Sequence, residues 1–378
     1  MRTRAAVLHG IGQDWSVEEV EMDPPQRGEV LVKTAVAGLC HSDEHLVTGD
    51  MASSLDGEST IFPVIGGHEG SGTVVEVGDG VTDVAVGDTV AVSFVPACGR
   101  CRWCTSGQQN LCDLGIGTMQ PGMVTDGTHR HHLADGSDLN TLAKLGTFAE
   151  HMVVASDSLV KVDPDVGMIP AALVSCGVAT GFGSAVNRAE VGAGDTVVVV
   201  GCGGIGSNAL QGAKAAGAKN VVAVDPAEFK RESAATFGAT HTAPSMEEAM
   251  ELVGGLTDGV MADAVIVAAG VVTGDMIAPA QFLTRKGGTI VVTGLAPMMQ
   301  MDVQLNLFEF AMMNKELKGT VFGSGSPRVE VPRLLGLYQA GQLKLDELVT
   351  RTYSLDEINQ GYQDMRDDKN IRGVIVFD

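Results

Sequence analysis

The sequence predicts an α/β protein of two domains, one mainly β and one built on a doubly wound parallel sheet. Residues 1–177 contain short alternating patterns, such as Val30–Val36, between glycine and aspartate turns, which are typical of β-strands. From residue 178 to residue 321, continuous apolar runs such as Asp195–Val200 alternate with helical patterns, as expected for strands buried on both faces of a parallel sheet. A chain of 378 residues is long enough for two such domains.

The last segment, residues 322–378, predicts two helices and a final strand. The helical patterns lie near Val331–Tyr338 and Leu355–Met365, and the strand pattern covers Arg372–Phe377. We expect this segment to return to the first domain. The sequence shows no internal repeat and no low-complexity tract.

Composition and charge exclude several classes of partner. Hydrophobic residues make up 44% of the chain and charged residues 19%, which predicts a packed core and excludes disorder. A net charge of -22 disfavours nucleic acid and anionic lipid. The apolar run nearest to a membrane span, Asp263–Val272, is far shorter than the ~20 residues that span a bilayer, and the N-terminus has no signal-peptide pattern. We therefore expect a cytoplasmic protein whose cysteines serve metal or redox chemistry.

Four cysteines lie close together between residues 95 and 113. Cys98, Cys101, Cys104 and Cys112 have the spacing C-x2-C-x2-C-x7-C. Four thiolates in so short a loop enclose one tetrahedral metal and leave no position for a substrate. An iron–sulfur cluster is the alternative, but ferredoxin-type runs have a different spacing and usually a following proline. The pattern favours a structural zinc lobe.

Three further segments carry metal-binding side chains. They are Cys40-His41-Ser42-Asp43-Glu44-His45, Gly67-His68-Glu69 and Cys176-Gly177. Together they supply two thiolates and one imidazole from distant parts of the chain. Three protein ligands with an open fourth position are the plan of a catalytic zinc.

A glycine-rich turn indicates a dinucleotide site. Gly201-Cys202-Gly203-Gly204-Ile205-Gly206 fits GxGxxG, follows a strand and opens a helix over Ser207–Ala216. The glycines permit a tight turn, close approach to a pyrophosphate and close helix packing. Asp225, after the next strand, can accept hydrogen bonds from ribose hydroxyls and would repel a 2′-phosphate, which favours NAD over NADP. Lys230, about one helical turn further on, is a candidate for the adenosine side.

These motifs, in this order and spacing, resemble the zinc-containing alcohol dehydrogenases of the medium-chain dehydrogenase/reductase superfamily over almost the whole chain. The resemblance implies a GroES-like catalytic domain, a Rossmann domain and two zinc ions per chain. Cys40, His68 and Cys176 match the ligands of the catalytic zinc, and the four-cysteine lobe matches the structural one. The implied reaction is hydride transfer between a small, primary alcohol and NAD(H), which gives an aldehyde, or the reverse.

The resemblance also implies roles for residues around the zinc. Glu69 matches the acidic residue behind the metal, and Asp43 matches the carboxylate that orients the ligand histidine. Ser42 matches the hydroxyl that takes the alcohol proton. The proton then passes through the cofactor ribose to His45, whose imidazole releases it to water.

Further matches concern the cofactor and the substrate channel. Thr180 and Arg372 match contacts to the nicotinamide and the pyrophosphate, and Thr293 and Leu295 fall in the loop that lines the nicotinamide pocket. His41 stands where many relatives have an arginine for the pyrophosphate. Phe94 matches a wall of the substrate channel. A homodimer joined through the cofactor domains, or a homotetramer, is implied in the same way.

Two segments, residues 94–104 and 224–231, look like the actinobacterial nicotinoprotein branch. Its members keep NAD(H) bound through turnover and use nitrosoaniline dyes as acceptors, so we expect tightly bound NAD(H) and an unknown electron acceptor. A dehydrogenase of thiol–formaldehyde adducts or of polyols is an alternative, although Asp113–Ile116 offers no cation for a glutathione carboxylate. A non-catalytic nucleotide-binding protein with structural zinc alone is a further alternative.

Three local features are specific to this chain. Residues 51–61 form a polar insertion, which we expect to be a loop beside the channel mouth. His129-Arg130-His131-His132 predicts a solvated loop, with a third metal site as the alternative. The methionine-rich stretch Pro297–Met313 predicts core filling, with a subunit contact or a substrate wall as alternatives.

Overall fold

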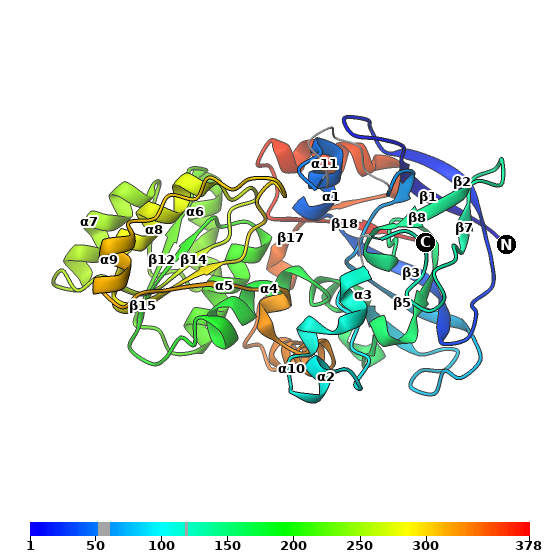
Figure 1. The fold of residues 1–378 in the computed structure, drawn as a ribbon, viewed down its shortest axis with the longest axis horizontal. Helices are drawn as coiled ribbons and strands as arrows, with labels where there is room; N and C mark the ends of the chain where they lie inside the picture. The colour runs from blue at the N-terminus through cyan, green and yellow to red at the C-terminus, as the bar shows by residue number, and fades with distance from the viewer. Residues whose placement is uncertain (52–60, 118–119) are drawn as a thin grey trace. The chain divides into compact units, whose positions relative to one another are not determined.

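The computed structural model describes residues 1–51, 61–117 and 120–378 (Figure 1). The chain divides into two compact units. The first combines Met1–Cys176 with Ser326–Asp378, and the second is Gly177–Gly325. Nearly all of the predicted polar loop, residues 52–60, lies outside the described residues.

The first unit contains a closed barrel and a second sheet. The barrel has the order β1-β2-β7-β8-β4, and the sheet has the order β10-β6-β5-β3-β18-β17, with β9 also paired to β3. The barrel strands are β1 (Arg2–Leu8), β2 (Ser16–Met22), β4 (Val64–Ile65), β7 (His131–His132) and β8 (Asp138–Thr141). The sheet strands are β3 (Glu29–Gly38), β5 (Gly70–Val77), β6 (Thr89–Val92), β9 (His151–Ala155), β10 (Leu159–Lys161), β17 (Val349–Tyr353) and β18 (Arg372–Val376).

The C-terminal segment completes this unit, as the sequence predicts. Strand β18 pairs antiparallel with β3, with Val374 opposite Gly38. The helices of the unit are α1 (His41–Thr48), α2 (Arg102–Thr105), α3 (Met168–Leu173), α10 (Pro327–Gln339) and α11 (Ile358–Arg366). Helix α10 begins four residues before the predicted start at Val331, because Ser326 precedes it and Pro327 occupies the first turn, where no intrahelical N–H is needed.

The second unit is a doubly wound α/β domain. Its six-stranded sheet has the order β13-β12-β11-β14-β15-β16, and all its pairs are parallel. The strands are β11 (Thr196–Val200), β12 (Asn220–Val224), β13 (His241–Ala243), β14 (Ala262–Val267), β15 (Thr284–Val292) and β16 (Glu316–Gly319). The helices are α4 (Gly177–Gly183), α5 (Gly204–Ala215), α6 (Glu228–Ala234), α7 (Met246–Leu256), α8 (Ile277–Leu283) and α9 (Leu307–Met312).

Valine-rich strands form the centre of the second unit. Val198, Val222 and Val265, on three neighbouring strands, are fully buried. Such strands bury both faces, which explains the continuous apolar runs in the sequence. The strand order places the carboxyl ends of β11 and β12 beside each other, where the glycine-rich turn begins.

Candidate metal and cofactor sites

Four side chains meet in the first unit. Cys40 lies between β3 and α1, His68 and Glu69 lie between β4 and β5, and Cys176 follows α3. Each offers a ligand atom within 4.8 Å of the others, and all four are buried. The structure thus brings together the two thiols and the imidazole that the sequence assigned to one site.

Asp43 holds His68 in place. Nδ1 of His68 lies 3.2 Å from Oδ2 of the buried Asp43, and the N–H of Gly67 donates to Oδ1 at 2.7 Å. Burial opposes protonation of His68, but the negative charges of Asp43 and Cys40 raise its pKa well above the usual value. An imidazole whose Nδ1 faces a carboxylate keeps Nε2 as its ligand atom.

Glu69 and Arg372 form a buried ion pair beside these ligands. The Arg372 guanidinium contacts the Glu69 carboxylate, whose other oxygen, Oε1, has no hydrogen-bond partner among the described residues. Burial raises the pKa of Glu69 to about 7, although the charge of Arg372 opposes this rise. Arg372, which the sequence assigned to the pyrophosphate, is here a neighbour of the metal-ligand group.

The two thiols are unequal. A hydrogen bond from Cys176 lowers the pKa of Cys40 well below its usual value, in spite of burial, with help from the charge of His68. The same bond and burial raise the pKa of Cys176. Two sulfurs, one imidazole and a carboxylate oxygen without a hydrogen-bond partner among the described residues lie together in a buried site. Sulfur and nitrogen donors of this kind fit zinc.

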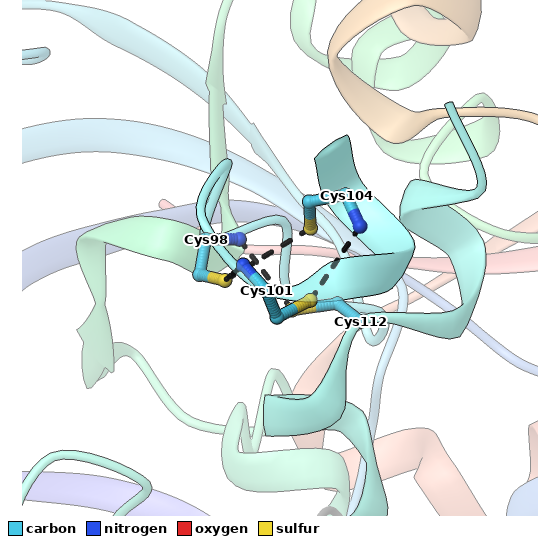
Figure 2. A group of neighbouring side chains, drawn as sticks. All are labelled: Cys98, Cys101, Cys104 and Cys112. Atoms are coloured by element: carbon cyan, nitrogen blue, oxygen red, sulfur yellow. Dashed lines mark hydrogen bonds between the residues drawn. The ribbon is translucent and has the colours of Figure 1, made fainter. Parts of the chain in front are cut away.

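The four lobe cysteines converge around one point (Figure 2). The Sγ atoms of Cys98 and Cys104 are 3.9 Å apart, and those of Cys101 and Cys112 are 4.0 Å apart. Sulfurs bound at ~2.3 Å to a tetrahedral zinc lie about 3.8 Å apart. The lobe therefore has the dimensions of a closed zinc site.

Backbone N–H groups favour the charged thiols of the lobe. The N–H of Cys101 points to Sγ of Cys98 at 3.4 Å, and that of Cys104 to Sγ of Cys101 at 3.5 Å. The N–H groups of Asp113 and Cys104 lower the pKa of Cys101 to about 6, whereas burial raises that of Cys104 to about 12. A cation at the centre would favour the thiolate of the second as well.

Helix α1 carries the predicted proton-relay residues. Oγ of Ser42 lies 3.7 Å from Sγ of Cys40, so this hydroxyl borders the ligand group. His45 is buried on the same helix, and its Nδ1 lies 2.9 Å from Oδ2 of Asp50. His41, at the start of the helix, is exposed. Asp50 was not among the predicted site residues, although Thr48-Gly49-Asp50 has the pattern of a turn after a helix.

Phe94 lies beside the same ligand group. Its ring meets the His68 ring edge to face, with centroids 5.8 Å apart. This position is compatible with a channel wall next to the metal, as the resemblance implies.

Glycines shape the turn between β11 and α5 in the second unit. Gly201 has φ +89°, and a side chain there would meet Ala269 at 2.7 Å. A side chain at Gly206 would collide with the carbonyl oxygen of Gly201. Gly203 differs, because a Cβ there would meet no atom within 4 Å. The fold does not require a glycine at 203, whereas a closely approaching pyrophosphate would.

Asp225 lies directly after β12, where the sequence predicted a ribose ligand. Its Oδ2 accepts the N–H of Cys202 at 2.8 Å, and its Oδ1 accepts the N–H of Ala227 at 2.9 Å. These bonds fix the carboxylate at the glycine-rich turn and leave lone pairs free on both oxygens. Ile205 is in the first turn of α5, and Lys230 is half-buried on α6.

Hydroxyl groups connect the predicted nicotinamide residues. Oγ1 of Thr293 donates to Oγ of Ser184 at 3.0 Å, and Oγ of Ser184 donates to the carbonyl of Thr180 at 2.6 Å. The hydroxyl of Thr180 is buried and has no hydrogen-bond partner in the part of the chain that is described. Leu295 is exposed. Ser184 had no distinctive sequence signal and was missed.

The histidine-rich segment is not a solvated loop. His131 and Arg130 are buried, and Arg130 donates from Nε and Nη2 to the buried Glu29 at 2.7 and 2.8 Å. Glu29 of β3, 101 positions earlier in the chain, therefore stabilises the buried guanidinium of Arg130. Within residues 1–51, 61–117 and 120–378, the metal-ligand groups are the two described above, and this segment contributes to neither.

The methionine-rich stretch also differs from the prediction of core filling. Five of its apolar side chains are largely exposed, namely Met301, Val303, Leu307, Phe308 and Met312. Leu317, on the neighbouring strand β16, is exposed as well. These six residues are called the apolar patch below.

A Cys–His–Cys group and a closed four-cysteine lobe, in a chain with a doubly wound nucleotide domain, define the class of zinc-dependent dehydrogenases. Residues 26–164 match the alcohol dehydrogenase GroES-like domain, and residues 204–340 match the zinc-binding dehydrogenase domain. The chain belongs to the zinc-binding alcohol dehydrogenase family. The predicted fold class, the family and the oxidoreductase activity are thereby confirmed.

Three relatives illustrate the similarity. The NDMA-dependent alcohol dehydrogenase of Amycolatopsis methanolica is 50% identical over 376 residues, which cover 100% of this chain and 99% of the relative. The S-(hydroxymethyl)glutathione dehydrogenase of Paracoccus denitrificans is 35% identical over 386 residues, which cover 100% of this chain and 100% of the relative. The crystal structure of benzyl alcohol dehydrogenase from Acinetobacter calcoaceticus has a TM-score of 0.90 and 30% identity, with both chains covered in full.

Family membership establishes the coarse chemistry. Enzymes of this family use zinc and an NAD-type cofactor and act on small alcohols. The predicted nicotinoprotein resemblance agrees with the NDMA-dependent relative. No helix in the described ranges is long and apolar enough to cross a membrane.

Proposed function

We propose that this chain interconverts a small, primary alcohol and its aldehyde with NAD(H), and holds two zinc ions for this purpose. Cys40, His68 and Cys176 would hold the catalytic zinc, and the four-cysteine lobe the structural one. The observation that carries the proposal is the convergence of three distant ligands within 4.8 Å in a buried site. When bound, zinc supplies a Lewis acid for the alcohol oxygen, and NAD supplies the hydride acceptor.

The residues around the ligands position them and move a proton. Asp43 orients His68, and Arg372 together with Glu69 sets the charge behind the metal. Ser42, next to Cys40, takes the hydroxyl proton of the alcohol, and His45 holds the proton before its release. Phe94 lines the substrate side of His68.

The second unit binds the cofactor in this proposal. Gly201, Gly203, Gly204, Ile205 and Gly206 form the pyrophosphate turn, and Asp225 binds the ribose. Thr180, Thr293 and Leu295 contact the nicotinamide, and Lys230 contacts the adenosine. In the first unit, His41 and Arg372 are the candidates for the phosphates. The 50% identity to an NDMA-dependent enzyme supports NAD(H) that stays bound through turnover, with an electron acceptor of unknown identity.

A homodimer, alone or paired as a tetramer, is the assembly we propose. Strand β16 is the edge of the six-stranded sheet, and the apolar patch lies on β16 and the stretch before it. An edge strand beside exposed apolar side chains favours pairing with a second copy. A charge at the patch, as in Phe308→Glu, should shift the sedimentation coefficient to that of a smaller species.

A cytoplasmic location is part of the proposal. All seven cysteines are free thiols, and six of them belong to the two ligand groups. Free thiols in metal-binding groups are typical of a reducing compartment.

One relative favours a second candidate function. The 35% identical enzyme from Paracoccus denitrificans is named for S-(hydroxymethyl)glutathione, so a thiol–formaldehyde adduct is a second substrate class. Asp113 and Leu114, directly after the last lobe cysteine, offer no cation for a glutathione carboxylate. Rates measured with primary alcohols, polyols and thiol–formaldehyde adducts, side by side, distinguish the candidates.

Zinc counting combined with analysis of bound cofactor tests the proposal. Purified protein that was never given cofactor should contain two zinc ions per chain, and denaturation should release NAD(H). Cys40→Ala should lose one zinc and all alcohol turnover. Cys202→Ala is the matched control for zinc content, because Cys202 is also buried but belongs to neither ligand group.

Different outcomes would contradict the zinc site and the bound cofactor separately. One zinc per chain in the native protein, or full turnover by Cys40→Ala, would contradict the catalytic zinc site. A supernatant without NAD or NADH would refute permanent cofactor binding and leave the dehydrogenase activity in place.

A further inference from the structure

A turn after α1 brings a carboxylate to the buried His45. The helix ends at Gly49, which has φ +83° and would carry a Cβ within 3.0 Å of the Ile11 side chain. The N–H of Met51 then donates to the carbonyl of His45 at 3.2 Å. Only glycine suits this reversal, because both the positive φ and the contact with Ile11 exclude a side chain.

The reversal places Asp50 against Nδ1 of His45 at 2.9 Å. The hydroxyl of Thr48 donates to the same oxygen, Oδ2, at 2.7 Å. Burial works against ionisation of Asp50, but these bonds from Thr48 and His45 lower its pKa below the usual value. Asp50 is therefore a carboxylate at neutral pH, and a carboxylate only accepts hydrogen bonds.

The nitrogen that faces Asp50 must accordingly carry a hydrogen. In neutral imidazole one nitrogen donates and the other accepts, so a proton on Nδ1 makes Nε2 the accepting atom. We propose that Asp50 is the positioning residue of His45, which it holds with the proton on Nδ1 so that Nε2 receives the proton from the reacting alcohol. This inference rests on the relay role of His45 in the proposed function.

The exposure of Asp50 suggests a second role, in the release of the proton from His45. The side chain of His45 is 3% exposed, whereas that of Asp50 is 28% exposed. After Nε2 receives a proton, the imidazolium has one proton on each nitrogen and a net positive charge beside the Asp50 carboxylate. The proton on Nδ1 then leaves at the side that reaches water, and the ring returns to neutrality.

Among the described residues, two other charged side chains of α1 have partners of their own. On α1, Asp43 binds Gly67 and His68. Glu44 accepts two hydrogen bonds from Arg366 of α11, at 2.7 and 3.1 Å. The charge of Arg366 is thereby balanced by Glu44, and His41 is exposed at the far end of α1. Asp50 supplies the negative charge at Nδ1.

Nitrogen NMR of the zinc-loaded enzyme tests the inference. The chain has nine histidines, and His45→Gln identifies the His45 signals in protein labelled with ¹⁵N-histidine. We expect neutral His45 to carry its proton on Nδ1. In Asp50→Ala we expect a mixture of the two tautomers, whereas Asp50→Asn keeps an accepting oxygen and should restore Nδ1–H without restoring the charge.

Alcohol oxidation supplies the second readout. We expect Asp50→Ala to lower kcat about tenfold near pH 7 with KM unchanged, because the His45 ring loses the carboxylate that holds the hydrogen on Nδ1. Asp23→Asn is the control, since it makes the same change of charge at another aspartate–histidine contact, 3.2 Å from Nε2 of His132. It should leave kcat and the His45 signals as in the native enzyme.

The two readouts separate the possible failures. Nε2–H in the native enzyme, or an unchanged tautomer in Asp50→Ala, overturns the role of Asp50 whatever the turnover. Full turnover by His45→Gln overturns the relay assigned to His45 in the proposed function, while the tautomer still decides whether Asp50 fixes the ring.

Discussion

The carboxylate of Asp43 holds the imidazole of His68 from one oxygen, at 3.2 Å, and the backbone of Gly67 from the other, at 2.7 Å. Asp43 is fully buried and stands three residues after Cys40 on the helix that follows this ligand. One side chain thus connects two of the three ligand segments. The orientation of the candidate ligands depends on this contact as well as on the ligands themselves.

Asp43→Asn should weaken zinc binding at this site. The amide keeps one accepting oxygen but loses the charge that orients His68 and raises its basicity, so we expect the zinc affinity to fall about 10–100-fold. Competition with a chromogenic chelator measures the affinity. The lobe zinc is the internal control, because none of its four cysteines touches Asp43. Equal loss of both zinc ions would point to general unfolding and contradict the expectation.

Two glycines of the nucleotide turn should respond differently to alanine. Gly206→Ala places a methyl group against the carbonyl of Gly201, so we expect the second unit to lose about 1–3 kcal/mol of stability. Gly203→Ala meets no atom of the protein within 4 Å and needs no positive φ, so its thermal unfolding should be unchanged.

Gly203→Ala should weaken cofactor binding although it leaves the stability unchanged. Gly203→Ala should retain less NAD(H) per chain after purification and bind added NADH at least about tenfold more weakly, because the methyl group occupies the approach of the pyrophosphate. Calorimetric unfolding and NADH fluorescence titration provide the two measurements. A Gly203→Ala enzyme with native NADH affinity would place the cofactor elsewhere.

Asp225 should determine the preference for NAD. Its carboxylate is fixed by the N–H groups of Cys202 and Ala227, so its charge stands where a 2′-phosphate would lie. In protein freed of its bound cofactor, Asp225→Asn should reduce the ratio of the affinity for NADH to that for NADPH by about tenfold or more. Glu228→Gln, an equal change of charge in the first turn of α6, should leave the ratio unchanged. If both variants shift the ratio equally, then net charge and not ribose recognition is responsible.

The sequence predicted those parts of the molecule that depend on local pattern. The valine run at Thr196–Val200 has the composition of a strand buried on both faces, and the glycines after it have the spacing of one turn. The grouping of the candidate metal ligands was also predictable, because sulfur and imidazole donors at these spacings are typical of zinc sites. Both inferences needed only the types of residue and their separations.

The parts that were not predicted depend on distant partners. The sequence around Arg130 is typical of a surface loop, and the ion pair with Glu29, which is buried on β3, adds a distant partner to the local Asp126. Phe308 and Met312 have apolar character that fits either a core or an interface, and they are exposed because α9 buries none of its residues. Asp50 could not be linked to His45 without the reversal at Gly49.

His131 should make the protein sensitive to acid. Burial lowers its pKa from 6.5 to about 4, and the positive charges of His132 and Arg130 add to this effect against the opposing charge of Asp23. Between pH 6.5 and pH 4 the unfolded chain therefore binds more protons at this histidine than the folded chain does. The free energy of unfolding falls as the pH falls through this window, by up to about 3 kcal/mol, and the full contribution is present above pH 6.5.

His131→Leu should remove this sensitivity. Neither ring nitrogen has a hydrogen-bond partner among the residues that the structure covers, so an apolar side chain of similar size sacrifices no hydrogen bond. Urea unfolding at pH 7 and at pH 5 should show the native protein losing about 2 kcal/mol more than the variant. The comparison between variants is needed because acid also protonates other groups in both proteins.

His132→Leu is the matched control for the pH experiment. His132 is more exposed and contacts Asp23 and Asp138 through its ring nitrogens, each at 3.2 Å. His132→Leu leaves the buried His131 ring in place, so it should not relieve the loss of stability in acid. The prediction is wrong if the free energy of unfolding falls equally in His131→Leu and in the native protein between pH 7 and pH 5. In that case protonation of His131 does not couple acid to unfolding.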